Sequence, residues 1–441
     1  MNRREFLKQA GVGAAALALP WALPKNIQAA EGRKPNIIFI LTDDVGLGNI
    51  SCCGGDNFKT PRIDALAKTG TRFEQCFSTP LCGPSRCQCL TGRYPFRTGM
   101  ISNASGDVPI PANEIMIPTI LKPAGYVTAQ VGKWFQLQGE PSEWGFDERL
   151  TFGGHGRYWG KQKPTYSVNG KMMTMSEDKY VGDLMHEFLV DFITRHKDQP
   201  FYVHYAMSHI HGPILPTPDS KDGSDHYADN VAYMDKLVGK LVDELERLDL
   251  RDNTVIIFVG DNGTAANWAD DRATVNGKRL SGQKGSMQEG GSRVPMIVSW
   301  PGTTPAGKVS KDLIDFSDYM PTFAALAGAS LPKDRVIDGH DFSPQLKGQK
   351  GKPREWVYVE LNGHWYARNQ GWKLTREGEL FDMSDAPFVE KPVPADTKDA
   401  KAIEARKTLQ AALDKLNPAA GKQAIVTPKP KKKKKQQTPA Q

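Results

Sequence analysis

The sequence predicts an α/β fold in which helices flank a large, mostly parallel central sheet, followed by a small C-terminal antiparallel sheet with one helix. Three observations support this prediction. Short apolar runs rich in β-branched residues, such as 35–42, are typical of strands buried on both faces of a parallel sheet. The stretch 230–250 carries apolar residues on one helical stripe. Beyond residue 345 the segments shorten and favour antiparallel strands.

Polar side chains follow the apolar runs of the main region. The expected strands lie in the segments 35–44, 125–134, 200–212, 253–263 and 294–302. Four of these runs end in charged, imidazole or amide side chains, which are Asp43, Asp44, Lys133, His209, His211, Asp261 and Asn262. Ligands in such sheets bind outside the carboxyl ends of the strands. The polar clusters therefore predict one shared site.

The remaining regions complete the expected organisation. The segments 355–361, 364–375 and 379–383 are expected to form the small sheet, and a helix fits residues 397–416. We therefore expect a main domain over 31–345 and a sheet-plus-helix subdomain over 346–420. Residues 421–441 form a lysine-rich, low-complexity tail whose composition is typical of disorder.

The net charge of +7 arises at the two ends of the chain. Residues 1–30 carry four basic side chains and one acidic one, and residues 422–441 carry seven lysines and no acid. The rest of the chain is slightly acidic. A basic surface for nucleic acid is therefore not predicted.

The first thirty residues are typical of an export signal. Arg3 and Arg4 stand together ahead of a short Gly- and Ala-rich apolar run, and small residues before Glu31 offer a cleavage site near Ala30. The paired arginines favour the twin-arginine route and its translocase, with an ordinary secretory signal as the alternative. Either route predicts a periplasmic or secreted protein. No other segment reaches membrane-spanning length, so no stable membrane span is expected.

The residue types at the strand ends suggest a metal and an oxyanion. Asp43, Asp44, Asp261 and Asn262 supply hard oxygen ligands, which suit calcium, or less well magnesium. Lys133, His209, His211 and Lys284, the last in the Gly-rich stretch 281–295, would add an anion pocket. Phosphate and sulfate both fit this chemistry.

The stretch 82–92, CGPSRCQCLTG, resembles the signature of the sulfatase family, with Cys82, Pro84, Ser85, Arg86, Leu90, Thr91 and Gly92 at the signature positions. The resemblance extends over nearly all of residues 35–390. The segment 41–55 resembles the family's first metal segment, 60–77 the helix leading to the signature, and 260–263 the second metal segment. The segment 125–134 resembles its second signature, and 283–302 its sulfate-binding lysine loop.

This resemblance implies a specific chemistry. A maturation enzyme would oxidise Cys82 to Cα-formylglycine, whose hydrate carries two hydroxyls on one carbon. One hydroxyl would attack sulfur and displace the alcohol, and the other would then lose its proton and expel sulfate. Calcium would be bound by Asp43, Asp44, Asp261 and Asn262 and would also touch residue 82. Arg86 would hold the hydrate, Lys133 and Lys284 would grip sulfate oxygens, and His211 would protonate the leaving alcohol.

The chain departs from the family pattern at Phe135, where the family usually has a histidine two residues after the lysine that matches Lys133. His209 or His155 would then supply the missing proton transfer, unless His211 acts alone. The expected substrates are sulfated carbohydrates or other sulfate esters. Two alternatives remain open: a phosphodiester or phosphonate monoester hydrolase of the same superfamily, and a non-catalytic protein that binds anionic glycans.

The paired arginines generate a prediction about export. Because the twin-arginine route moves folded cargo, replacing Arg3 and Arg4 with lysine should trap active, formylglycine-bearing protein in the cytoplasm. Fractionation followed by an activity assay of each compartment checks this. Efficient export of the double variant, Arg3→Lys with Arg4→Lys, would assign the signal to the general secretory route.

Overall fold

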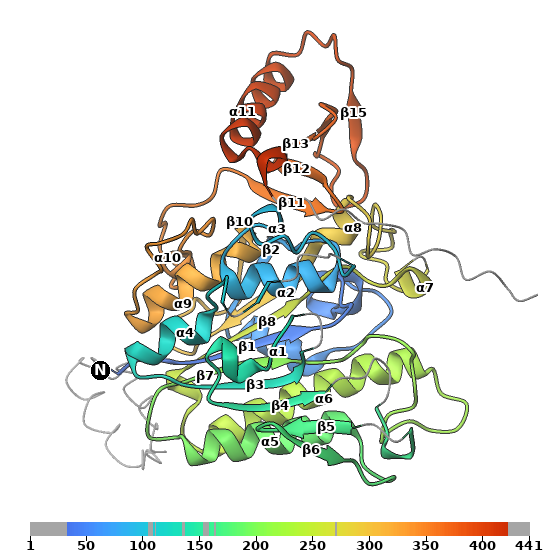
Figure 1. Ribbon diagram of the computed structural model, residues 1–441. Coiled ribbons are helices and arrows are strands. Elements are labelled where there is room, and N and C mark those ends of the chain that lie inside the picture. The colour runs from blue at the N-terminus through green and yellow to red at the C-terminus, as the bar shows by residue number, and fades with distance from the viewer. Residues whose placement is uncertain are drawn as a thin grey trace, which may run out of the picture.

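The computed structural model describes residues 33–104, 109–110, 112–134, 137–152, 158–162, 165–269 and 271–421. The predicted export signal, the lysine-rich stretch 422–441, Phe135 and His155 lie outside these residues. Within them a large sheet is covered by helices on both faces, and a smaller sheet with one helix stands beyond one edge (Figure 1). The predicted fold class is confirmed.

The large sheet contains ten strands in the order β10-β2-β9-β8-β1-β7-β3-β4-β5-β6. Its centre is parallel, because β1 pairs with β8 and β7, and β3 pairs with β7 and β4, all in the same direction. The strands are β1 (Asn36–Thr42), β2 (Thr71–Phe77), β3 (Val127–Lys133), β4 (Glu148–Phe152), β5 (Thr165–Val168), β6 (Lys171–Thr174), β7 (Phe201–Ala206), β8 (Thr254–Gly260), β9 (Arg293–Ser299) and β10 (Lys308–Asp315).

Strand β9 departs from the parallel arrangement that its buried apolar run suggested. It runs antiparallel to both neighbours, β8 and β2. A parallel connection needs a crossover that returns the chain to the opposite edge of the sheet. Between β8 and β9 the described residues contain only the one-turn helices α7 (Ala266–Ala269) and α8 (Glu289–Ser292). The chain thus enters β9 from the edge at which it left β8.

The segment 60–77, expected as one helix, divides into helix α1 (Pro61–Lys68) and strand β2. Gly70 lies between them, where an added Cβ would come within 2.1 Å of the Val298 carbonyl oxygen. After this close approach the chain continues along β9, with Phe73, Cys76 and Phe77 buried. The apolar residues of 71–77 therefore serve a strand, which the helix prediction missed.

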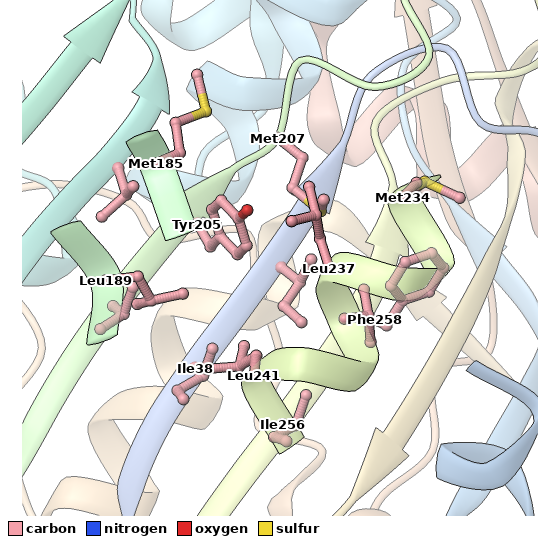
Figure 2. Close-up of a cluster of buried hydrophobic side chains, with 14 of the residues drawn as sticks. Ile38, Met185, Leu189, Tyr205, Met207, Met234, Leu237, Leu241, Ile256 and Phe258 are labelled. Carbon is pink, nitrogen blue, oxygen red and sulfur yellow. The ribbon is translucent and has the colours of Figure 1, made fainter. Parts of the chain in front are cut away.

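Two apolar layers cover the faces of the large sheet. Residues of β1 alternate between them, with Ile38 and Ile40 in one core cluster and Ile37, Phe39 and Leu41 in the other. Figure 2 shows part of the first layer, the core cluster to which Ile38 of β1, Leu189 of α5 (Val181–Arg195), Leu237 and Leu241 of α6 (His226–Arg247), and Ile256 and Phe258 of β8 belong. The helices over this face are α1, α5 and α6, and the helices over the other are α2 (Cys82–Thr91), α4 (Ile117–Leu121) and α9 (Tyr319–Ala327).

The small sheet joins five strands in sequence order, all antiparallel. Four of them lie within the three expected segments, because 364–375 divides into two strands; β15 was not predicted, because it is only three residues long and includes Pro392. Helix α11 packs on this sheet through apolar residues such as Leu409 and Leu413. The elements are β11 (Val357–Leu361), β12 (His364–Arg368), β13 (Trp372–Thr375), β14 (Leu380–Asp382), β15 (Lys391–Val393) and α11 (Ala400–Leu416).

The two sheets share an apolar contact. Phe77 of β2 and Leu313 of β10 cluster with Val357, Val359 and Tyr366 of the small sheet. Two further short helices are α3 (Pro95–Thr98) and α10 (Ser343–Leu346). Among the described residues, no helix combines the length and apolar character that crossing a bilayer requires.

Candidate active site

The predicted strand-end clusters meet at one edge of the large sheet. Asp43 and Asp44 follow β1, and Asp261 and Asn262 follow its neighbour β8. On the other side of β1, His211 follows β7, and Lys133 ends β3. The strand order therefore gathers residues that are far apart in sequence, such as Asn262 and Asp44, which are 218 positions apart and share a hydrogen bond.

Local backbone geometry turns two consecutive carboxylates toward this edge. Asp44 has a φ of +61°, in the left-handed region that Asp tolerates better than most residues. Its N–H donates to Asp261 Oδ1 at 3.1 Å. The N–H of Asp43 donates to the carbonyl oxygen of His209 at 2.8 Å, and the Asp43 carbonyl accepts from Ile210 N–H. These bonds fix the loop after β1 against the loops after β7 and β8.

The oxygen-bearing side chains form a candidate cation site. Asp43, Asp44, Asp261 and Asn262 are all buried. Asp43 Oδ1 and Asn262 Oδ1 have no hydrogen-bond partner among the described residues, which is costly for buried acceptors unless an ion binds them. Ligand atoms of Asp43, Cys82 and Asp261 lie within 4.8 Å of one another. Hard oxygen donors in this number fit a divalent cation such as calcium or magnesium.

Three cations neutralise these carboxylates. Arg86 donates to Asp261 Oδ2 from Nη2 at 2.8 Å and from Nε at 3.1 Å. Lys133 Nζ donates to Asp43 Oδ2 at 2.6 Å, and Lys284 donates to Asp44 Oδ1. Each of these cations contacts one of the candidate metal ligands, so negatively and positively charged side chains lie side by side in the site.

Burial and neighbouring charges shift the pKa values of Asp261 and Asp43 in opposite directions. Burial raises the pKa of Asp261 to about 7, reinforced by the charge of Asp43 and only partly offset by Arg86. Burial acts the same way on Asp43, but Lys133 and Arg86 outweigh it and hold the pKa of this carboxyl well below its usual range. A bound cation would favour the ionised form of both.

Helix α2 presents Cys82 to this cluster. The helix begins at Cys82, two residues ahead of Pro84, and its whole length is buried. Thr79 and Ser85 hydroxyls are 2.7 Å apart, and Ser85 Oγ also donates to the Thr79 carbonyl at 2.8 Å, which pins the first turn. The positive end of the helix therefore lies at residue 82, where it favours negative charge.

The other cysteines of the signature stretch have a different environment. Cys87 and Cys89 lie in the apolar layer between α2 and the sheet. Burial raises the pKa of Cys87 to about 12 and raises that of Cys89 further. Thiols with raised pKa values are poor nucleophiles and metal ligands. Only Cys82, of the three, shares a cluster with the carboxylates.

The two predicted histidines separate in space. His211 Nε2 lies 4.0 Å from Asp44 Oδ2, and its side chain is 22% exposed, which suits contact with a substrate. The ring of His209 is buried, bonds through Nε2 to the Tyr180 hydroxyl at 2.9 Å and stacks on Tyr158. Burial lowers the pKa of His209 to about 4. The ring of His209 thus packs among tyrosines, and its backbone carbonyl is what reaches Asp43.

Tyr158 also positions His211, because its hydroxyl donates to the carbonyl oxygens of His211 and Ser208 at 2.6 and 2.9 Å. Aromatic side chains near such a site can stack on sugar rings, but Tyr158 and Trp144 are buried and serve packing. Trp134 and Trp159 are half-buried.

Sequence reasoning missed Asn103. Its Nδ2 lies 3.5 Å from Cys82 Sγ, and its Oδ1 accepts from Gly83 N–H at 2.9 Å. Asn103 belongs to the irregular segment after α3, which carries no motif. No signal in a single sequence marks such a residue, because its role depends on a tertiary contact.

The small sheet holds the loop that carries Lys284, a second feature that the sequence did not reveal. Lys373 donates to the Met287 carbonyl at 3.1 Å and forms a buried ion pair with Glu390. Glu390 accepts from the N–H of Glu289 at 2.9 Å. The Tyr366 and Ser292 hydroxyls are 2.7 Å apart. The part of the loop from 287 to 292, which follows Lys284, is therefore held against the small subdomain.

Comparison with known proteins identifies the family. The sulfatase family model matches residues 35–329, and the model described as N-sulphoglucosamine sulphohydrolase, C-terminal, matches residues 282–409. The chain belongs to the sulfatase family. It is a sulfuric ester hydrolase.

Individual relatives support the same assignment. The chain is 32% identical to N-acetylgalactosamine-6-sulfatase of Canis lupus familiaris over 84% of this chain and 77% of that protein. It is 30% identical to arylsulfatase D of Homo sapiens over 79% and 75% of the two chains. Among solved structures it resembles Ps i-CgsB in complex with k-i-k-neocarrahexaose, with a TM-score of 0.75, 28% identity and coverage of 89% and 94%. It also resembles the PsFucS1 sulfatase from Pseudoalteromonas sp., with a TM-score of 0.74, 26% identity and coverage of 90% and 93%.

The clamp on the Lys284 loop generates a prediction. Replacing Lys373 with Met leaves the Glu390 carboxylate buried without its cation, which should lower the free energy of unfolding by about 3–5 kcal/mol. The loosened loop should also raise KM for a sulfate ester. Denaturant unfolding and steady-state kinetics measure both effects. Replacing Glu390 with Met as well should recover most of the stability, because an apolar pair leaves no buried charge.

Lys391 provides the matched control, since its ion pair with Asp385 is solvent-exposed on both sides. Lys391→Met should change neither stability nor KM appreciably. Equal effects of the Lys373 and Lys391 variants would show that the buried clamp has no special importance.

Proposed function

We propose that this protein is an exported, calcium-dependent sulfatase that hydrolyses sulfate esters on glycans, with Cys82 converted to Cα-formylglycine by a maturation enzyme. The observation that carries the proposal is the position of Cys82 Sγ, at the first residue of α2 and in one cluster with the carboxylate oxygens of Asp43 and Asp261. Here Sγ stands in for the oxygens that the Cβ of formylglycine would bear. The hydrate would supply one hydroxyl to attack sulfur and a second whose deprotonation releases sulfate.

The chain's own residues then have definite tasks. Asp43, Asp44, Asp261 and Asn262 would hold calcium, which supplies positive charge to the reacting oxygens. Arg86 orients residue 82 from within the same helix, one turn further on. Lys133 and Lys284 bind sulfate oxygens and stabilise charge that moves onto them. Their present carboxylate partners, Asp43 and Asp44, keep both ammonium groups directed into the site.

His211 is the proposed acid for the leaving alcohol. Its partly exposed ring lies at the rim, and the Tyr158 hydroxyl holds its backbone. His209 is a poor candidate for the proton transfer that Phe135 cannot perform, because its ring is bonded to Tyr180. We therefore assign the acid role to His211 and set aside His209, one of the two histidines, His209 and His155, that were expected to compensate. His155 lies outside the described residues.

Two kinds of similarity favour glycan substrates. The name of one relative specifies sulfated N-acetylgalactosamine, and one similar structure holds a neocarrahexaose. The export signal predicted in residues 1–30 would place the enzyme in the periplasm or outside the cell, after passage through the twin-arginine translocase. We propose a catalytic domain over 31–345 and a supporting subdomain over 346–420.

The central test combines modification and turnover. Coexpression with a formylglycine-generating enzyme should yield a residue-82 peptide that resists thiol alkylation and reacts with a hydrazide. This protein should hydrolyse sulfated oligosaccharides and matched aryl sulfates, and Cys82→Ala should be inactive yet folded. An ordinary thiol at residue 82 after coexpression would refute the modification. Faster turnover of matched phosphate esters would support the phosphoester hydrolase instead, and a folded, modified protein that turns over neither would be a binding protein.

The proposed metal ligands generate a prediction about calcium. Exhaustive chelation should abolish turnover and lower thermal stability, because a ligand that binds only the folded state stabilises it by about 2.7 kcal/mol at a hundredfold excess over its Kd. Added calcium should restore both. Asp261→Asn should require more calcium for half-maximal stabilisation, as measured by thermal unfolding across a calcium titration.

Asp271→Asn is the matched control, because the Asp271 side chain is 80% exposed and pairs with Arg279 at the surface. It should respond to calcium like the wild type. Full activity after chelation would contradict the calcium assignment.

A further inference from the structure

Asn103 contacts the reactive residue and the helix that bears it. Its Oδ1 accepts from the backbone N–H of Gly83 at 2.9 Å, and its Nδ2 points to Cys82 Sγ at 3.5 Å. The orientation of the amide is determined, because a backbone N–H can only donate and must face the oxygen. The NH₂ group is therefore the part of Asn103 that faces residue 82. It delivers a neutral donor to the reacting position.

Gly83 makes this contact possible. A Cβ at position 83 would lie 2.4 Å from Asn103 Oδ1 and 2.7 Å from the terminal methyl carbon of Met100. Contacts this short force the neighbours to move. The absence of a side chain at residue 83 thus lets the Asn103 amide approach both the helix start and residue 82. Leu81, which precedes the helix, provides no side-chain cap of its own.

Residue 82 is approached by two kinds of side chain, a charged group and the neutral amide of Asn103. The carboxylate oxygens of Asp43 and Asp261 cluster with Sγ, and the charges of Arg86 and Lys284 also act on it. The hydrate oxygen that attacks sulfur would lie beside these charged side chains, because they stabilise the charge that develops on it. The hydrated carbon carries only one other oxygen. The Asn103 amide reaches residue 82 from a separate segment, so this second oxygen is its natural partner.

We propose that Asn103 is a catalytic residue that donates a hydrogen bond to the oxygen that stays on the Cβ of residue 82. The inference rests on the proposed function. In the release step this hydroxyl gives its proton to a solvent water molecule, its oxygen electrons form the C=O bond, and the C–O bond to sulfate breaks with its electron pair leaving on sulfate. Water then adds to the aldehyde and restores the hydrate. A fixed neutral donor stabilises the negative charge that develops on that oxygen and cannot itself take the proton.

Three variants separate this role from simple capping of α2. Asn103→Leu removes both the acceptor for Gly83 N–H and the donor. Asn103→Asp keeps the acceptor and removes the donor. Gly83→Ala displaces the Asn103 amide without changing it. Asn113→Leu, at an exposed asparagine in the following segment, is the control.

The measurements are the thermal midpoint, kcat with a saturating aryl sulfate, and the fraction of residue-82 peptide that carries sulfate after an acid quench. The value of kcat and the sulfated fraction are both normalised to the fraction of enzyme in which residue 82 is formylglycine. Asn103→Leu should lose about 10²-fold in kcat, the usual effect of deleting one oxyanion donor, and sulfated residue 82 should accumulate. Asn103→Asp should show the same accumulation with a near-normal midpoint. Gly83→Ala should show the same loss of kcat as Asn103→Leu. The double variant, Gly83→Ala with Asn103→Leu, should lose no more kcat than either single variant.

Two results would overturn the inference while leaving the sulfatase assignment intact. One is wild-type kcat in Asn103→Asp. The other is a lowered midpoint in Asn103→Leu without covalent sulfate on residue 82, which would make Asn103 a helix cap only. A wild-type protein that retains the Cys82 thiol, or that fails to hydrolyse sulfate esters, would instead overturn the proposed function, and the role of Asn103 would fall with it.

Discussion

The mutual neutralisation of buried charges at the carboxyl edge of the sheet is the constraint on which the rest of the site depends. Asp43, Asp44 and Asp261 are almost completely buried, and an unpaired charge at such depth is strongly unfavourable. Their cationic partners come from different elements: Lys133 from β3, Lys284 from the loop before β9, and Arg86 from α2. Each ion pair therefore ties one element to the β1–β8 core, and the site cannot form unless these elements are in place together.

The same requirement explains why the small C-terminal sheet matters for a distant reaction centre. A Gly-rich loop such as 281–292 has little intrinsic order, so a lysine on it needs external support to remain in a fixed position. The buried Lys373–Glu390 pair and the Tyr366–Ser292 hydrogen bond supply that support from the other sheet. The apolar contact of Phe77 and Leu313 with the small sheet aligns the two sheets. The position of Lys284 in the site and the packing of the small subdomain therefore depend on the same interactions.

Much of the fold could be predicted because local patterns determined it. Continuous apolar runs indicated β1, β3, β7 and β8, and the stripe on 230–250 indicated α6. The direction of β9 and the division of 60–77 into helix and strand could not be predicted in this way. Both depend on where the chain re-enters the sheet, which is a matter of pairing between distant segments. The same limit hid β15, whose sequence has almost no strand signal of its own.

For the site, the sequence by itself determined the kind of chemistry: hard oxygen ligands, cations and a complete signature around Cys82. It could also propose which residues take part, since strand ends of a parallel sheet converge. The tertiary structure decided how they are used. It separated His211 from His209 by burying the ring of His209 among tyrosines. It brought Asn103 to Cys82 through the space left by Gly83. Residue type limits what a side chain can do, but distance and burial decide whether it does so, and these arise only when remote segments pack together.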